Sequence, residues 1–490
     1  MSKLRRFPLA APSLALFLAA MAGCSVGPNY SPPDTALAPA FHDPAQAAPP
    51  PDQPGIGWKQ AQPSDDRLRG QWWELYGDPQ LNSLEARVAV SNQTLKAALA
   101  QYTQAMAAVA QYRSQYYPTL SFGQGYARDR VSNNRPLGIP NKGNPYTDLT
   151  AIGQAAWEPD LWGNIRRTVA QARDNAQASA ADLANVELSL RAELAMDYFE
   201  LRGLDTQTQL LEDTVTEYRN YLHLTQVRFR GGLATDADVA QAQTQLDQTI
   251  AQSIDVEVAR AQYEHAMATL TGQPAASFSL ARAPLTLTLP VLPVDVPSAL
   301  LERRPDVAAA ERRAAAANEQ IGIAIAAYYP QLSLTGTGGF ESANIGTLFQ
   351  GPGSLWSLGA SASELLFDAG RRHALTEEAR AAYDQAAANY RQTVLQSFED
   401  VEDQLSALSV LNRESSAQQH TVADAERALA ISTRQYKGGL TTYLQVITAQ
   451  AMALSNQRTA ADITTRQFAA SVLLVKALGG GWDRASLPHP

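Results

Sequence analysis

Cysteine is almost absent from this chain, which has one in 490 residues. A single cysteine excludes an intramolecular disulfide and a cysteine-based metal cluster. The six histidines are scattered and none forms an H-x-x-x-H pair, so no metal site is expected. The net charge of −9 gives no basic surface for nucleic acid. No run of about 18 or more apolar residues occurs, so no transmembrane helix is expected.

The N-terminal region contains a short apolar segment. Basic residues precede an apolar run at 9–22, which is too short for a comfortable membrane span. Small residues then lead to Cys24, and the string Met21–Cys24 resembles a bacterial lipobox. We therefore expect a signal peptide at 1–23 and acylation of Cys24, whose two or three acyl chains would anchor the protein stably. An ordinary signal peptide followed by a chance cysteine is the alternative.

Two copies of one short pattern organise the rest of the chain. The first is RFRGGLATDADVAQAQTQLDQT at 228–249, and the second is QYKGGLTTYLQVITAQAMALSN at 435–456. Each has a Gly-Gly-Leu turn between two helical patterns, and glycine commonly follows a helix because it tolerates positive φ. These turns are predicted at 230–235 and 437–442. Two matched copies so far apart indicate an internal duplication.

Periodicity predicts long helices and short strands in each half. Apolar residues keep heptad spacing before and after each turn, which is typical of coiled-coil packing. Alternating apolar and small residues follow Tyr-Tyr-Pro in both halves and predict β-hairpins. The expected helices cover about 80–116, 160–229, 236–271, 305–328, 371–436 and 442–478. The expected strands cover about 119–131, 147–157, 331–341 and 354–366.

The four expected strands limit what one chain can do in a membrane. A transmembrane barrel needs at least about eight strands, and open strand edges cannot face lipid. If the strands enter a membrane, several chains must therefore contribute to one barrel. The predicted organisation is a lipidated tether at 24–70, a first repeat at 71–272, a connector at 273–297, a second repeat at 298–478 and a tail at 479–490.

Three segments spread over nearly the whole chain resemble one family. They are CSVGPNY at 24–30, LLERRPDVAAAERRAAAANEQIGIAIAAYYPQLSLTG at 300–336 and YKGGLTTYLQVITAQ at 436–450. They resemble the TolC-like outer membrane efflux proteins and, within them, the NodT-type lipoproteins. The resemblance implies a mainly α fold with β-strands in the membrane. Each chain of a homotrimer would give four strands to a twelve-stranded β-barrel, which a periplasmic α-helical barrel continues.

The same resemblance implies an exit duct and not an enzyme, and the sequence has neither a P-loop nor a glycine-rich dinucleotide motif. Such ducts sit in the bacterial outer membrane and extend into the periplasm. They receive small molecules such as drugs from an inner-membrane transporter through a periplasmic adaptor. The NodT-type resemblance favours a transporter of the resistance–nodulation–division type. No cofactor is implied apart from the covalent lipid on Cys24. A protein-secretion duct and a coiled-coil structural lipoprotein are the alternatives.

The resemblance also implies a periplasmic gate at the two turns. The constriction residues of the second repeat correspond to Gln445 and Thr448, and a hydrophobic ring corresponds to Leu444. Neither Gln445 nor Thr448 is acidic, whereas the family often has an aspartate there. A closing hydrogen bond corresponds to Asp238 and Tyr436. The alternatives are that Asp238 is favoured by its helix dipole and that Tyr436 is a core residue.

The hairpin turns are also a possible contact surface for the adaptor. A basic residue precedes each glycine pair, although a cation near a helix C-terminus is ordinary. The residues concerned are Arg230, Gly231, Gly232, Lys437, Gly438 and Gly439.

Overall fold

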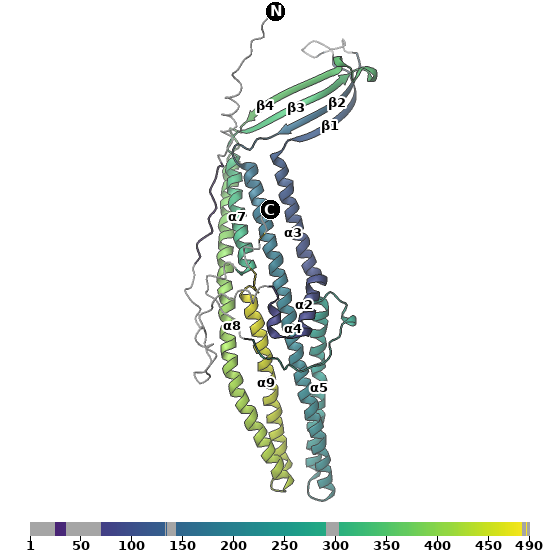
Figure 1. Cartoon of the computed structure of the whole chain (residues 1–490), viewed down its shortest axis with the longest axis vertical. Helices are drawn as coiled ribbons and strands as arrows, with labels where there is room; N and C mark the ends of the chain where they lie inside the picture. Colours follow the sequence, from purple (N-terminus) through teal and green to yellow (C-terminus); the bar gives the residue numbers. More distant parts are fainter. Residues whose placement is uncertain are drawn as a thin grey trace, which may run out of the picture.

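The protein is elongated, with a β-sheet at one end and the tips of two helical hairpins at the other (Figure 1). A computed structural model describes residues 25–35, 70–132, 134, 144–290, 303–482 and 487. Cys24, the expected signal peptide, most of the tether and the end of the connector lie outside these residues. What was predicted for them stays a prediction.

Two helices of 67 residues each form the long axis of the molecule. The first, α4 (Asn164–Arg230), turns back into α5 (Asp236–Leu270). The second, α8 (Arg371–Lys437), turns back into α9 (Tyr443–Ala477). Both hairpins turn within one residue of where the duplicated Gly-Gly-Leu pattern predicts. The hairpins lie side by side because α4 packs against α9 (Figure 1).

Shorter helices cover the half of the molecule next to the sheet. α3 (Gln93–Arg113) packs on α4, and α7 (Pro305–Ala326) packs on both α4 and α8. A short 3-10 helix, η2 (Trp72–Tyr76), and α2 (Pro79–Ser91) precede α3. Among the described residues, no helix is both long enough and apolar enough to cross a membrane.

The continuous helix expected at 80–116 is wrong, because the chain breaks at Asn92 between α2 and α3. Asn92 has an extended backbone, with ψ of 128°, and its side-chain oxygen accepts the Leu95 amide at 2.9 Å. Its side-chain nitrogen donates to the Leu270 carbonyl at the end of α5, also at 2.9 Å. Asn92 therefore caps one helix and ties it to another, which offsets the loss of continuous helix. The periodicity of the sequence gives no sign of this break.

Four antiparallel strands form one sheet in the order β1-β2-β3-β4. They are β1 (Thr119–Asp129), β2 (Tyr146–Trp157), β3 (Gln331–Ser342) and β4 (Ser354–Ser363), so each lies within three residues of its predicted ends. The predicted hairpins are the pairs β1–β2 and β3–β4. The structure adds the pairing of β2 with β3, which joins the two repeats. β4 ends before 366 because its pairing with β3 ends where Gln331 faces Ser363.

The outer edges of this sheet, on β1 and β4, have no partner strand within the described part of the chain. Several large apolar side chains on these two strands are exposed as well. Exposed apolar patches of this kind mark membrane or protein contacts. The side chains are Leu120, Phe122, Tyr126, Trp356 and Leu358, each at least 68% exposed.

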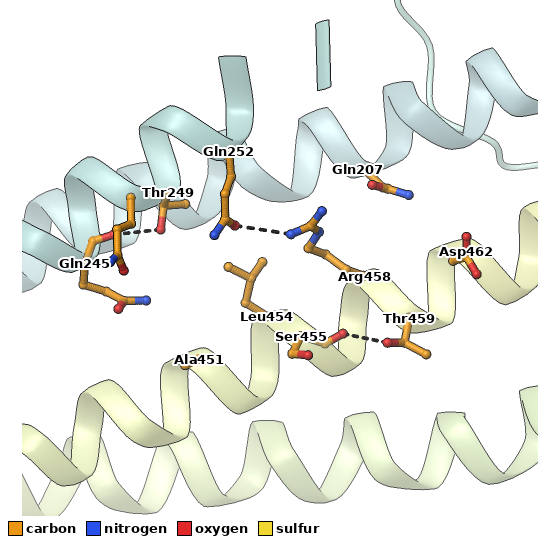
Figure 2. Close-up of a pocket in the computed structure, with 11 residues that line it drawn as sticks. Gln207, Gln245, Thr249, Gln252, Ala451, Leu454, Ser455, Arg458, Thr459 and Asp462 are labelled. Atoms are coloured by element: carbon orange, nitrogen blue, oxygen red, sulfur yellow. Dashed lines mark hydrogen bonds between the residues drawn. The ribbon is translucent and has the colours of Figure 1, made fainter. Parts of the chain in front are cut away.

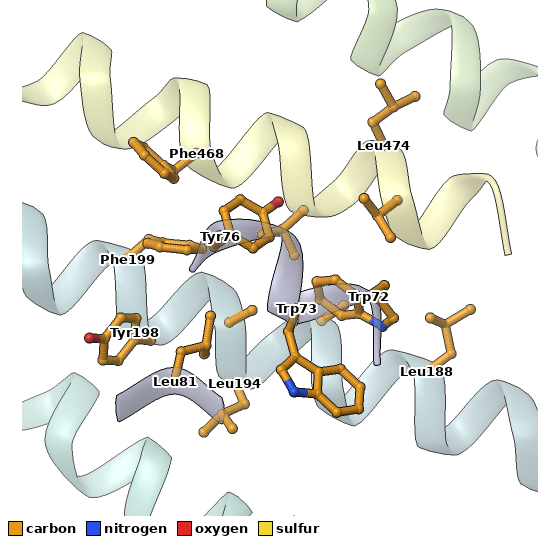
Figure 3. Close-up of a cluster of buried hydrophobic side chains, with 14 of the residues drawn as sticks. Trp72, Trp73, Tyr76, Leu81, Leu188, Leu194, Tyr198, Phe199, Phe468 and Leu474 are labelled. Atoms are coloured by element: carbon orange, nitrogen blue, oxygen red, sulfur yellow. The ribbon is translucent and has the colours of Figure 1, made fainter. Parts of the chain in front are cut away.

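The main hydrophobic core lies midway along the molecule, where η2 is held between α4 and α9 (Figure 3). Tyr76 lies 4.8 Å from Phe199, measured between ring centroids, and Phe199 lies 4.7 Å from Phe468. The Tyr76 hydroxyl also meets the Ser471 hydroxyl at 2.8 Å. Because Phe199 and Phe468 come from different repeats, this core joins the two halves of the duplication.

The described part of the connector is fastened to the first repeat by buried charges. Asp205 on α4 accepts hydrogen bonds from Arg260 on α5 at 2.7 Å and from the Ala283 amide at 3.0 Å. Arg260 donates in turn to the Leu280 carbonyl at 2.7 Å. These bonds pair buried charges and hold the connector against the long hairpin.

Candidate functional site: the tips of the two hairpins

Both hairpin tips end their first helix in the same hydrogen-bonded turn. In the first tip, the Gly232 amide donates to Phe229 at 2.9 Å and the Leu233 amide donates to Arg228 at 2.8 Å. The second tip repeats this pattern, with Gly439 donating to Tyr436 at 3.0 Å and Leu440 to Gln435 at 2.9 Å. This is the Schellman arrangement, which satisfies the last carbonyls of a helix.

The second glycine of each pair is the one that the turn requires. Gly232 has φ of 71° and Gly439 has φ of 77°, a region in which side chains with a Cβ are strained. Gly231 and Gly438 have negative φ and belong to the end of the helix. Each tip thus requires glycine at one position only, the second of its pair.

The helices that leave the two tips begin differently. Thr235 and Asp238 form a reciprocal capping box at the start of α5: the Asp238 amide donates to the Thr235 hydroxyl, and the Asp238 carboxylate accepts the Thr235 amide at 2.8 Å. Thr442 occupies the equivalent position before α9, and among the described residues it makes no side-chain capping bond.

One arginine joins the two tips. The Arg228 guanidinium of α4 donates to the Tyr436 carbonyl at 3.0 Å and to the Lys437 carbonyl at 3.3 Å, the last carbonyls of α8. The guanidinium carbon also lies 4.6 Å from the centre of the Tyr436 ring. A cation at a helix C-terminus is favourable, and a cation over an aromatic ring adds about 0.5–2 kcal/mol. Arg228 therefore holds the end of α8 against α4.

A buried polar and aromatic cluster supports this contact. The Tyr436 hydroxyl, on a side chain only 3% exposed, meets the Thr225 hydroxyl at 3.3 Å. The Tyr221 and Thr433 hydroxyls meet at 3.1 Å one turn further from the tip. The rings of Tyr436 and Tyr443 lie 5.3 Å apart, and burial raises the pKa of Tyr443. The cluster thus links α4, α8 and α9 at the tip.

The structure does not bring the predicted pair Asp238 and Tyr436 into a hydrogen bond. In this part of the described chain the Asp238 carboxylate is occupied by Thr235, and the Tyr436 hydroxyl faces Thr225. The placement of each residue matches the alternatives weighed from the sequence, a first-turn carboxylate and a core tyrosine. At the tips, the hairpins are linked instead by Arg228 and by the hydroxyl contacts of Tyr436 with Thr225 and of Tyr221 with Thr433.

The sequence reasoning missed Arg228, although the two copies contain a signal for it. Aligning the glycine pairs sets Arg228 opposite Gln435, so a cation in the first copy has a neutral counterpart in the second. A position that differs between two otherwise similar copies is a candidate for a contact between them.

The three predicted constriction residues lie at the start of α9. The Leu444 side chain is 56% exposed, and the Thr448 hydroxyl donates to the Leu444 carbonyl at 3.0 Å. The Gln445 carboxamide accepts a hydrogen bond from the Thr441 hydroxyl. Together with α8 they line a shallow and mainly apolar hollow of about 310 Å³, whose other residues are Ala425, Ala428, Ala449 and Met452.

The predicted contact residues of the turns are exposed. Arg230, Lys437 and the four glycines are all exposed to solvent. Leu233 and Leu440 follow the glycines and are 72% and 83% exposed. Each tip therefore exposes a basic side chain on the last residue of its first helix and an apolar side chain in the turn that follows.

Above the tips, the two hairpins separate around a polar cleft of about 650 Å³ between α5 and α9 (Figure 2). Gln252 and Arg458 point toward one another across it, with a hydrogen bond of 3.3 Å (Figure 2). Toward the core, α4 and α9 come close again, and a Cβ at Gly203 would lie 2.2 Å from the Thr465 hydroxyl. The hairpins are therefore in tight contact at mid-length and joined by few polar contacts below it.

The described residues contain no cluster of three or more His, Cys, Asp or Glu side chains that could hold a metal ion.

Comparison with known proteins relates this architecture to membrane channels. The family model described as outer membrane efflux protein matches residues 86–273 and 296–480. The pyoverdine export outer membrane protein OpmQ of Pseudomonas aeruginosa is 30% identical over 423 residues, covering 85% of this chain and 89% of that protein. The solvent efflux pump outer membrane protein SrpC of Pseudomonas putida is 30% identical over 479 residues, covering 96% and 98%.

Among solved structures, the outer-membrane channel OprN superposes with a TM-score of 0.84 at 28% sequence identity. The match covers 94% of this chain and all of the OprN chain. The two-repeat helical body and the four-stranded sheet are thus present together in a solved channel.

Proposed function

Because the chain belongs to the outer membrane efflux protein family, we propose that it is the outer membrane exit channel of a tripartite efflux pump. The observation that carries this proposal is the architecture itself. A short sheet with two unpaired edges in the described chain continues into helical hairpins, and the superposition on the OprN channel covers all of the OprN chain.

The proposed cargo is a small molecule. OpmQ is named for pyoverdine export and SrpC for solvent efflux, and both names support small-molecule cargo over protein secretion. A periplasmic adaptor and an inner-membrane transporter, of the resistance–nodulation–division type, are the proposed partners. The exposed turn residues, Arg230 to Leu233 and Lys437 to Leu440, are the surface that we assign to the adaptor.

A homotrimer completes the proposed channel. Three copies of a four-stranded sheet make a barrel of twelve strands, an even number within the range of such barrels. The unpaired edges of β1 and β4 would then pair between neighbouring chains, which removes open edges from lipid. The exposed apolar side chains of these strands support a lipid-facing surface.

The lipid anchor on Cys24 is a proposal about a residue outside the described part of the chain. Its support is the position of the residues that follow it. The Val26 amide donates to the Trp162 carbonyl at 3.1 Å, just after β2 ends and before α4 begins. Acyl chains attached next to this junction would enter the membrane beside the sheet.

We further propose that the tips are a gate and that Arg228 restrains it. Its two hydrogen bonds to the end of α8 hold the second hairpin against the first. Leu444, Gln445 and Thr448 would form the narrowing rings of the trimer, which set passage by size and polarity. Asp238 remains a candidate for a closing contact that this conformation does not contain.

The experiment is single-channel conductance of the purified full chain in planar bilayers. The test variant is Arg228→Gln, and the matched control is Arg230→Gln. Arg230 lies two residues away on the same helix and has no ion pair or side-chain hydrogen bond to any described residue. We expect Arg228→Gln to raise conductance or open probability severalfold, whereas Arg230→Gln behaves like the wild type.

The outcomes separate the two proposals. No conductance in any variant overturns the channel. Conduction that is equal in the wild type, Arg228→Gln and Arg230→Gln overturns the restraint by Arg228 and leaves the channel standing. A third variant, Asp238→Ala, tests the other tip residue: an increase like that of Arg228→Gln makes Asp238 part of the closing contact, and unchanged conductance limits it to its capping box.

A further inference from the structure

A short segment that follows the predicted lipidation site is seated on the helices of both repeats. We call residues 26–34, Val-Gly-Pro-Asn-Tyr-Ser-Pro-Pro-Asp, the strap. The strap has no helix or strand of its own, and it lies along α7 from a point next to the sheet toward the middle of α8. An extended segment without regular structure keeps one path only when side chains satisfy its backbone.

The first fixed point of the strap is a slot on α4 and α7. The Arg167 guanidinium, on a side chain 5% exposed, donates to the Val26 carbonyl at 2.7 Å and to the Glu319 carboxylate at 2.8 Å. Gly322 leaves room for this arginine, because a Cβ there would lie 2.2 Å from its Cδ. A Cβ at Gly27 would lie 2.6 Å from the Gly322 Cα, and Gly27 has φ of 101°. Only glycine fits at both positions.

The second fixed point is a buried chain of charges. The Tyr30 hydroxyl donates to the Glu311 carboxylate at 2.7 Å, and Glu311 is 2% exposed. Arg312 pairs with Glu311 at 2.5 Å and reaches Asp174 on α4 at 3.2 Å. The strap therefore supplies the neutral donor for a carboxylate that also belongs to the contact between α7 and α4. A buried carboxylate that loses such a partner is costly.

The remaining contacts continue along the same line. The Asn318 side chain donates to the Pro28 carbonyl at 3.3 Å, and Asn318 is itself buried. Further along, Arg391 on α8 donates to the Asp34 carbonyl at 3.1 Å. The strap thus contacts α4 of the first repeat and both α7 and α8 of the second.

We propose that the contact residues of α4, α7 and α8 form a recognition site for the strap, and that the seated strap clamps the first repeat to the second below the sheet. The strap is matched to this face by its own sequence: Gly27 allows close approach, Tyr30 reaches the buried carboxylate, and prolines at 28, 32 and 33 lie in the segment without helix or strand. This role depends neither on acylation of Cys24 nor on channel activity. In this role the strap keeps α4 and α7 aligned. These helices adjoin β2 and β3, the strands through which the two repeats pair.

The test compares Gly27→Ala with Gly70→Ala in the full chain purified in mild detergent. Both glycines have positive φ, at 101° and 86°, so both substitutions strain the backbone. Of the two, only Gly27 packs against α7, since a Cβ there would meet Gly322, whereas no described atom lies within 4 Å of a Cβ at Gly70. The readouts are hydrogen exchange of the strap and of the facing parts of α4 and α7, together with the thermal midpoint.

We expect Gly27→Ala to speed exchange at least tenfold both in the strap and in the facing turns of α4 and α7, and to lower the thermal midpoint, with Gly70→Ala unchanged in these regions. A second variant, Tyr30→Phe, keeps the ring and removes the donor to Glu311, and we expect a smaller change in the same direction. Exchange in Gly27→Ala equal to that in Gly70→Ala overturns the seating. A released strap with unchanged exchange in α4 and α7 overturns the clamp.

Discussion

Glu85 is a carboxylic acid side chain that is fully buried, whereas glutamate usually lies at the surface. It lies in α2 against the main core with none of its side chain exposed, and neither carboxylate oxygen has a hydrogen-bond partner among the described residues. Burial raises the pKa of Glu85 well above its ordinary value, and Glu187 adds to this, whereas Arg191 opposes it. The neutral carboxyl is therefore the form that the folded protein accommodates.

This burial predicts a stability that falls as pH rises. The pKa of Glu85 in the folded protein lies above that of the unfolded chain, so its favourable contribution is complete below about pH 4. It is lost as pH rises through the folded pKa, at about 1.4 kcal/mol for each unit of the shift. We expect Glu85→Gln to raise the thermal midpoint at pH 8 and to match the wild type near pH 4. Thermal unfolding across this range measures the difference.

The matched control is Glu74→Gln, because Glu74 is exposed on the neighbouring η2. Its midpoint should follow the wild type at every pH. A difference between Glu85→Gln and the wild type that stays constant with pH would contradict a neutral buried carboxyl.

At the scale of elements, the hairpin turns show which part of a sequence pattern carries a structural requirement. Both glycines of each pair look equivalent in the sequence, and only the second of each has positive φ. The long helices on either side follow from local heptad spacing, so their positions could be predicted from the sequence. The break at Asn92 could not, because its reason is a carbonyl 178 residues away at the end of α5.

The first turn therefore predicts unequal effects for two adjacent substitutions. Gly232→Ala forces a residue with a Cβ into the left-handed region, which costs about 1–2 kcal/mol. Gly231 has φ of −84°, which any residue can adopt. The Cβ added by Gly231→Ala would make only ordinary contacts, the nearest with the Arg228 carbonyl oxygen at 3.5 Å. Hydrogen exchange of the tip amides should be roughly tenfold faster in Gly232→Ala than in Gly231→Ala. Equal exchange in the two variants would mean that the turn adopts another conformation.

At the scale of the whole molecule, the duplication leads to one body and not to two domains. The main core takes Phe199 from the first repeat and Phe468 from the second, and the sheet joins the repeats through β2 and β3. The family and the solved relative agree with this single body, since the match to OprN runs over 94% of the chain. What one chain leaves open is the pair of sheet edges on β1 and β4 in the described residues.

These edges predict the assembly. Native mass measured in mild detergent should correspond to three chains, because three sheets of four strands supply a closed barrel and one sheet does not. Denaturing the same sample should return the mass of a single chain, which is the internal control. A stable single chain in mild detergent would contradict the shared barrel, and the coiled-coil structural lipoprotein would then be the better interpretation.

The sequence by itself determined the repeat, the long helices, the four strands and the glycine turns, because each of these follows from periodicity or composition within a short window. The tertiary structure decided the pairing of β2 with β3, the break at Asn92, the seating of the strap and the contact of Arg228 with Tyr436, which are 208 residues apart. It also directed Asp238 to its own helix and not to Tyr436. The physical reason is that a buried polar group bonds to whichever partner the packed fold brings within reach. The local sequence does not say which distant residue that partner is.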